Sequence, residues 1–212
     1  MSENEKTLAP YRSKRDFRRS PEPRGKGSHG WREDGNPLFV IQHHDASSEH
    51  FDFRLEIDGT LASWAVPKGP STDPAEKRLA VRVEDHPLDY ADFEGVIPPG
   101  QYGAGTVLVW DAGPYRNLRS DEDEDDLSMK ESLEQGQIEV WLEGRKLRGG
   151  YALIHSRMGG DEKNWLLVKM DDEGADARRK PTSTEPESVI SGRTLDQVAD
   201  QARTGRGDGT DE

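Results

Sequence analysis

The 212-residue chain contains no cysteine and few apolar residues. Without cysteine it can form neither disulfides nor thiolate metal ligands, so a metal site would need His, Asp and Glu. No run of about 18 apolar residues could span a membrane, and the N-terminus lacks a signal-peptide pattern. We therefore predict a cytoplasmic protein without a membrane partner.

Hydrophobic residues make up 31% of the chain and charged residues 33%. This balance predicts that part of the chain does not join a packed core. The net charge of −13 is unevenly spread: residues 1–30 are basic, whereas residues 121–126 and 171–212 are acidic. We expect an N-terminal arm over residues 1–30, one domain over residues 31–172, and an acidic, disordered tail over residues 173–212.

Short β-patterned runs separated by turn residues recur along the presumptive domain, and such spacing favours a barrel or a sandwich. The expected strands are 38–44, 50–57, 60–66, 79–85, 104–110, 137–142, 150–156 and 164–170. One short helix is expected over residues 127–135, ended by Gly136. A second candidate helix, over residues 194–202, has its apolar residues on one face.

The strongest local pattern is the alternation in His50–Ile57. In a strand it directs the aromatic and aliphatic side chains to one face, and His50, Asp52, Arg54 and Glu56 to the other. If residues 38–44 form the second strand of a hairpin, His44 pairs with His50, Gln42 with Asp52, and Val40 with Arg54. The register is well specified, because a slip by one residue would bury the polar set.

This hairpin gathers His44, His50 and Asp52 on a face that we expect to point toward solvent. Two imidazoles and a carboxylate suit Mn, Fe or Zn with open coordination positions. A solvated strand face with a His–Asp hydrogen bond explains the same residues, and the pattern alone leaves both readings open.

Several basic groups accompany this cluster. Arg54 could clamp a phosphate or form an ordinary ion pair. Lys68 and Arg78 could add positive charge or be solvated. His86 follows a strand and could act in acid–base chemistry or simply end that strand. The glycine-rich segment 93–105 lacks phosphate-loop spacing and precedes a strand, so we exclude a P-loop.

A family resemblance emerges when these motifs are taken in order. From about residue 11 to residue 171 the chain resembles the 3′-phosphoesterase domain of bacterial and archaeal DNA ligase D. The matching runs are His44–Ala46, His50–Glu56, Trp64–Pro70, Arg78–Ala80, Glu84–Pro87, Phe93–Pro98, Tyr102–Gly105, Trp110–Asp111 and Trp165–Lys169. No Lys-x-Asp-Gly ligase motif is present, so the chain looks like a free-standing version.

The resemblance implies a mainly β fold: a compact, closed β-barrel of about eight strands with its active site on the outer surface. It also implies a manganese-dependent hydrolase that removes 3′-terminal ribonucleosides and then 3′-phosphates, leaving 3′-OH ends for repair. The implied substrates are DNA or RNA–DNA 3′ ends. A separate DNA ligase, a polymerase and a Ku-like end-binding protein are the implied partners.

Carried over residue by residue, the resemblance assigns manganese to His44, His50 and Asp52. It gives catalytic roles to Arg54, His86 and Tyr90, and places substrate contacts at Arg15, Asp16, Glu22, Gln42, Lys68 and Arg78. It thereby implies that the arm folds over the site. Phe51 and His43 replace the Tyr and Lys common in the family, and Ser47–Glu49 is less basic.

Two alternatives to this function remain at this stage. A non-haem iron oxygenase or cupin-like enzyme uses the same ligand types, with iron and oxygen. A non-catalytic nucleic-acid end-binding module could keep the fold without turnover.

Overall fold

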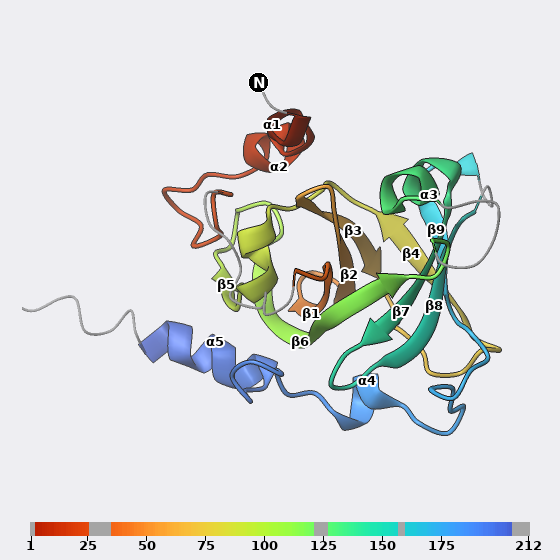
Figure 1. The fold of residues 1–212 in the computed structure, drawn as a ribbon. Coiled ribbons are helices and arrows are strands. Elements are labelled where there is room, and N and C mark those ends of the chain that lie inside the picture. The colour runs from red at the N-terminus through yellow and green to blue at the C-terminus, as the bar shows by residue number, and fades with distance from the viewer. Residues whose placement is uncertain (1–2, 26–34, 121–126, 157–159, 205–212) are drawn as a thin grey trace, which may run out of the picture.

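The computed structural model describes residues 3–25, 35–120, 127–156 and 160–204 (Figure 1). Their strands form one antiparallel sheet in the order β1-β2-β3-β4-β9-β8-β7-β6-β5, and pairing of β1 with β6 closes eight strands into a barrel. The strands are β1 Leu38–Asp45, β2 His50–Ile57, β3 Thr60–Val66, β4 Lys77–Arg82, β5 Gly95–Ile97, β6 Gly105–Asn117, β7 Gln137–Glu143, β8 Arg148–His155 and β9 Asn164–Lys169. The mainly β barrel is confirmed, and β5 is an additional strand paired with β6.

The β1–β2 hairpin has the predicted register. His44 pairs with His50, Gln42 with Asp52, and Val40 with Arg54. Its apolar face joins the barrel core, in which Phe39, Phe53 and the facing Trp64 are fully buried. His43 is the polar residue on that inner face, and its ring stacks on Phe51 with centroids 4.2 Å apart.

The polar face of β2 lies outside the barrel but is not solvated, which differs from the expectation. Asp52, Arg54 and Glu56 are at most 7% exposed. A second hydrophobic cluster, which includes Tyr11, Val40, Leu61 and Tyr90, attaches two segments to this outer face. These segments are the N-terminal arm, with helices α1 Glu3–Thr7 and α2 Ala9–Ser13, and the 3₁₀ helix η1 Leu88–Asp92. Covering the polar row encloses the predicted cluster without sealing it inside the barrel.

The C-terminal segment also differs from the expectation, because residues 173–204 are folded against the barrel. They contain helices α4 Pro181–Thr184 and α5 Leu195–Thr204, and α5 lies against β5 and β6 (Figure 1). Backbone carbonyls hold this segment: Glu185 accepts hydrogen bonds from Trp110 Nε1 and Lys146 Nζ, both at 2.7 Å. Val198 of α5 joins the barrel core. The polar composition of this segment predicted disorder. The segment is instead held through its backbone carbonyl groups, which every residue provides whatever its side chain.

Helix α3, Met129–Gln135, confirms the expected short helix. Ser128 and Glu131 form a capping box at its N-terminus, and Gly136 ends it with φ of 78°. Both features use standard helix-terminus chemistry that can be recognised in the sequence.

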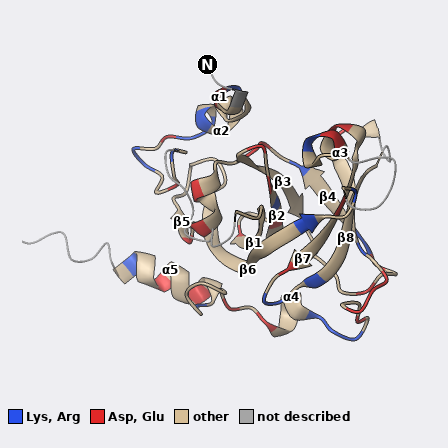
Figure 2. Ribbon diagram, in the orientation of Figure 1, with Lys and Arg blue, Asp and Glu red and all other residues tan. Residues whose placement is uncertain are grey.

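The remaining expectations concern boundaries and charge. The boundary expected between residues 30 and 31, the acidic run 121–126 and the end of the tail after residue 204 all lie outside the described residues. Figure 2 shows acidic and basic positions interspersed over the elements, with basic positions in the arm. Within the described ranges, no helix has the length and apolar character needed to cross a membrane.

Candidate metal and phosphate site

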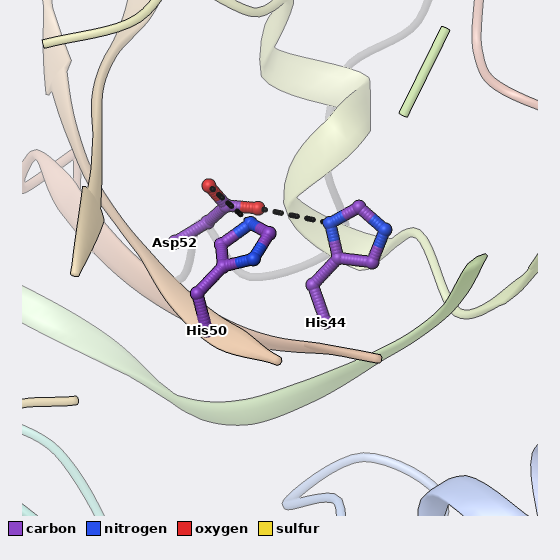
Figure 3. A group of neighbouring side chains, drawn as sticks. All are labelled: His44, His50 and Asp52. Carbon is purple, nitrogen blue, oxygen red and sulfur yellow. Dashed lines mark ion pairs between the residues drawn. The ribbon is translucent and has the colours of Figure 1, made fainter. Parts of the chain in front are cut away.

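His44, His50 and Asp52 converge on the outer face of the hairpin (Figure 3). One potential ligand atom from each lies within 4.8 Å of the others. His44 Nδ1 and His50 Nε2 are each 3.7 Å from a carboxylate oxygen of Asp52. Donors bound to one ion at about 2.0–2.2 Å are at most about 4.4 Å apart, so a shift of a few tenths of an ångström would close this set.

The surroundings of the two imidazoles fit a metal. His50 Nδ1 donates to the Ser48 carbonyl at 2.8 Å, which leaves the lone pair of Nε2 on the Asp52 side. His44 Nε2 is buried and has no hydrogen-bond partner among the described residues. The His44 ring is therefore not fully satisfied by the protein.

Asp52 is ionised in this environment. Its burial alone raises the pKa, but the Arg54 guanidinium, with the two imidazoles, outweighs that effect and holds the pKa of Asp52 well below its ordinary value. Arg54 Nη2 lies 3.1 Å from Asp52 Oδ2. The site therefore presents two imidazole nitrogen donors and one negative oxygen donor, a set suited to a divalent transition metal.

Arg54 is 2% exposed and is held on several sides. Its Nε donates to Gln42 Oε1 and its Nη1 to Ser63 Oγ, both at 2.8 Å. Gln42 in turn donates to the carbonyls of Tyr90 and Phe93 at 3.0 and 3.1 Å. Gln42 thus fixes the guanidinium relative to η1, and leaves Arg54 Nη2 beside Asp52.

His86 lies between two guanidinium groups. Burial, followed by the positive charges of Arg54 and Arg15, holds the pKa of His86 well below its ordinary value, so the ring is neutral. Arg15 Nη2 is 3.1 Å from His86 Nε2, and because a guanidinium only donates, Nε2 accepts. We assign the ring proton to Nδ1, because the Glu84 carbonyl, 2.9 Å away, can only accept. Arg54 Nη1, 2.9 Å from the same Nδ1, is then a close contact rather than a hydrogen bond.

The N-terminal arm completes the site through Arg15 and Glu22. Arg15 Nε donates to Glu22 Oε1 at 2.7 Å, and both side chains are almost fully buried. Tyr90 donates its hydroxyl proton to the same oxygen at 3.2 Å. Burial, and then the charge of Glu22, raises the pKa of Tyr90 well above its ordinary value, so this phenol remains protonated.

These groups surround one cavity of about 180 Å³. Its lining includes Arg15, His44, His50, Asp52, Arg54, Glu84, His86, Tyr90 and Tyr102. Since water takes up about 30 Å³ in the liquid, a cavity of this size admits a phosphate group with a few waters.

Comparison with known proteins shows which family the chain resembles. The family model of the DNA ligase D 3′-phosphoesterase domain matches residues 42–155. A Pseudomonas aeruginosa protein named multifunctional non-homologous end joining protein LigD is 52% identical over 194 residues, covering 90% of this chain and 22% of that protein.

The chain belongs to the DNA ligase D 3′-phosphoesterase domain family.

Mycobacterial relatives extend the comparison. The LigD protein of Mycolicibacterium smegmatis is 44% identical over 166 residues, covering 78% of this chain and 21% of the relative. The Mycobacterium tuberculosis protein, named multifunctional non-homologous end joining DNA repair protein LigD, is 44% identical over 168 residues, with coverages of 78% and 20%. The chain thus spans about a fifth of the length of these relatives.

The structure brings most of the expected phosphoesterase residues together, but not Asp16, Lys68 or Arg78. Asp16 is exposed and accepts a hydrogen bond from the backbone N–H of Arg18 at 3.0 Å. Lys68 is exposed after the end of β3. Arg78 forms an ion pair with Glu76. Within the described residues, none of the three lines the cavity, so their substrate contacts remain predictions.

Two cavity residues were not identified as site residues from the sequence. Glu84 forms ion pairs with Lys14 and Arg15, at 3.0 and 3.1 Å. A signal for Glu84 was present, because in an extended segment it lies on the same side as His86, two residues away. Tyr102 belongs to a loop, where periodicity gives no facing direction.

Proposed function

We propose that this chain is a metal-dependent phosphoesterase that processes the 3′ ends of DNA or RNA–DNA strands. It removes a terminal ribonucleoside to leave a 3′-phosphate, and removes that phosphate to leave a 3′-OH. The observation that carries the proposal is the arrangement of His44, His50 and Asp52 in one cavity with Arg15, Arg54 and His86. Family membership favours this function over an iron oxygenase with the same ligand types.

His44, His50 and Asp52 would hold the divalent ion, for which we propose manganese. Bound there, the ion would supply Lewis-acid polarisation of a phosphoryl oxygen and help to provide a nucleophilic water.

The protein's own cations would bind and orient the phosphate. Arg54 is fixed by Gln42 and Ser63 before substrate arrives, so little reorganisation is needed when it donates to a phosphoryl oxygen. Arg15 approaches from the arm, next to His86. A phosphate between these guanidinium groups would accept hydrogen bonds from both.

His86 is the group placed to handle the leaving oxygen. Once a phosphate accepts the hydrogen bonds of Arg15, the Nε2 atom of His86 can take up the proton released by the attacking water and pass it to the leaving oxygen. In the first reaction water adds to phosphorus, the bond to O5′ of the terminal ribonucleoside breaks, and O5′ leaves as a hydroxyl. In the second, the bond to O3′ breaks and inorganic phosphate is released. In both reactions we assign His86 Nε2 to protonation of the departing oxygen.

The test measures phosphate release from a DNA primer with a 3′-phosphate in the presence of Mn²⁺. We expect His50→Ala and Asp52→Ala to lower the rate by at least about 100-fold, because each removes a metal ligand. His155→Ala is the matched control: His155 lies on β8, its ring is tilted against Trp165 with centroids 5.2 Å apart, and it is not among the residues that line the cavity.

Circular dichroism checks that each variant is folded. Wild-type rates in folded His50→Ala or Asp52→Ala would refute the metal assignment. Failure of the wild-type protein to act on either 3′-phosphate or 3′-ribonucleotide ends, across several divalent metals, would refute the function.

For the cellular setting, we propose action in the prokaryotic cytoplasm, at DNA ends. Non-homologous end joining appears in the names of the LigD relatives, and a ligase, a polymerase and a Ku-like end-binding protein are the partners that such a reaction requires.

A further inference from the structure

Tyr102 lines the proposed phosphate cavity, yet its ring is largely open to solvent. It is 47% exposed. Among the described residues, a few large apolar side chains are this exposed, and Tyr102 is the aromatic one. The function proposed above gives no role to this ring. An exposed aromatic ring at the edge of a phosphate cavity offers a flat, apolar surface beside a charged site.

The loop between β5 and β6 fixes the position of Tyr102. Two turns hold this loop, with hydrogen bonds of 3.2 Å from Gln101 N to the Pro98 carbonyl and from Ala104 N to the Gln101 carbonyl. Gly103 has φ of 74°, which favours glycine. A Cβ at Gly103 would lie 4.0 Å from Cε1 of His44, so the residue after Tyr102 lies against a proposed metal ligand.

The Tyr102 hydroxyl is tethered to the opposite wall of the cavity. It donates to Glu84 at 3.4 Å and accepts from Lys14 Nζ at 3.3 Å. The Lys14 ammonium lies 4.7 Å from the ring centroid, and the Arg15 guanidinium 5.4 Å. The Arg15 guanidinium is thus a neighbour of both the Tyr102 ring and His86, the residue assigned to protonate the leaving oxygen.

We propose that Tyr102 stacks on the nucleobase of the nucleoside whose oxygen leaves the phosphorus. This inference rests on the proposed phosphoesterase function. A cavity of about 180 Å³ holds the phosphate, so the sugar and base must extend over its edge. Every base has a π-face, so stacking on Tyr102 binds any sequence. Lys14 adds a positive charge for the neighbouring backbone.

The experiment crosses two proteins with two substrates. The proteins are wild type and Tyr102→Ala; the substrates are primers ending in a 3′-phosphate on a normal nucleotide or on an abasic residue. Base–aromatic stacking contributes about 1–3 kcal/mol per base, so we expect wild type to prefer the base-bearing end by about ten-fold in kcat/KM. Tyr102→Ala should lose most of this preference.

Two further variants separate stacking from other roles of the residue. Tyr102→Phe keeps the ring but removes the hydroxyl contacts to Glu84 and Lys14, and it should keep the preference. Ile154→Ala removes an exposed apolar side chain on β8, 41% exposed and away from the cavity, and it should behave as wild type.

The outcomes distinguish this inference from the function on which it rests. If wild type releases phosphate but its preference is unchanged in Tyr102→Ala, or is lost equally in Tyr102→Phe, the stacking role is wrong and the function stands. If wild type releases no phosphate from the base-bearing primer, the proposed function itself fails on that substrate.

Discussion

Arg54 connects the metal group to the anion-binding groups through one planar side chain. It contacts Asp52, Gln42, Ser63 and His86 within 3.1 Å. The contact with His86 Nδ1 is not a hydrogen bond in the assigned tautomer, because both atoms would donate. An arginine suits this place better than a lysine, because Nε, Nη1 and Nη2 each meet a different partner, Gln42, Ser63 and Asp52.

His86 should make the stability of the protein depend on pH. Its folded-state pKa is lowered, because burial and the charges of Arg54 and Arg15 oppose protonation. The unfolded chain therefore binds a proton more readily as the pH falls below about 6.5. Stability is fully present above that pH and declines below it, by up to about 1.4 kcal/mol per pH unit for one proton.

Chemical denaturation at pH 7 and pH 5 measures this effect. The free energy of unfolding of wild type should fall more between these values than that of His86→Asn, which carries no titrating group at this position. Equal losses in the two proteins would contradict the assignment of a neutral His86.

The place of a side chain in the site could be predicted where strand alternation determines which face of the strand it occupies. His44, His50, Asp52 and Arg54 were placed together because the hairpin register follows from the apolar pattern. Arg78 pairs with Glu76 and does not line the cavity, so its substrate contact, implied by the family resemblance, remains a prediction. Tyr102 was missed because its position depends on a loop.

At the scale of elements, β6 is the strand that both closes the barrel and supports the metal hairpin. Its first half pairs with β1 on one edge and with β5 on the other, and its last residues pair with β7. Gly105 begins β6 with φ of 147°, and a Cβ there would lie 2.2 Å from the backbone oxygen of Asp45. A side chain at Gly105 cannot fit unless the end of β1 moves.

We expect Gly105→Ala to lower the free energy of unfolding by more than about 1 kcal/mol. It should also weaken Mn²⁺ binding, because the displaced Asp45 directly follows His44.

Gly100→Ala is the matched control, with φ of 79° but no atom within 4 Å of the added Cβ. It should cost stability but leave Mn²⁺ affinity unchanged. Denaturant titration and calorimetry measure the two quantities, and equal Mn²⁺ affinity in wild type and Gly105→Ala would exclude this coupling.

Elements were predictable from the sequence where they carry a local pattern. Each of the eight expected strands corresponds to an observed one, and α3 has its capping residues. The short strand β5 has no alternation long enough to detect. Helix η1 is a single short turn. Gln42 holds it in place by donating a hydrogen bond to the Tyr90 carbonyl.

For the whole molecule, two chain segments far apart in sequence are held on the barrel by different means. The arm is attached by the apolar contacts of Tyr11 and by side-chain ion pairs of Lys14 and Arg15 with Glu84. The C-terminal segment is attached by hydrogen bonds from barrel side chains to its backbone, as at Glu185. Barrel closure and the covering of the polar face were expected only from the family resemblance, and the order of the C-terminal segment was not expected, because each depends on long-range contacts rather than on local periodicity.

Metal binding should stabilise the whole fold. A ligand that binds the native state adds about 2.7 kcal/mol at 100 times its Kd, which for a protein of this size raises Tm by roughly 5–10 °C. We expect this rise in Tm when Mn²⁺ is added to wild type and to His155→Ala, and its loss in Asp52→Asn. A rise of the same size in Asp52→Asn would place the stabilising ion elsewhere. Thermal melts with and without a chelator provide the comparison.

The three proposed metal ligands all come from a single hairpin, which also carries Arg54, whereas Arg15 and His86 come from distant parts of the chain. Closing the short loop between adjacent strands costs little entropy, so the ligands can meet early in folding, even in a chain that has not yet formed its barrel. The anion-binding groups meet only after the arm has docked. Binding of the proposed manganese ion would therefore report only on the hairpin, whereas binding of a phosphate would also require that the arm has docked.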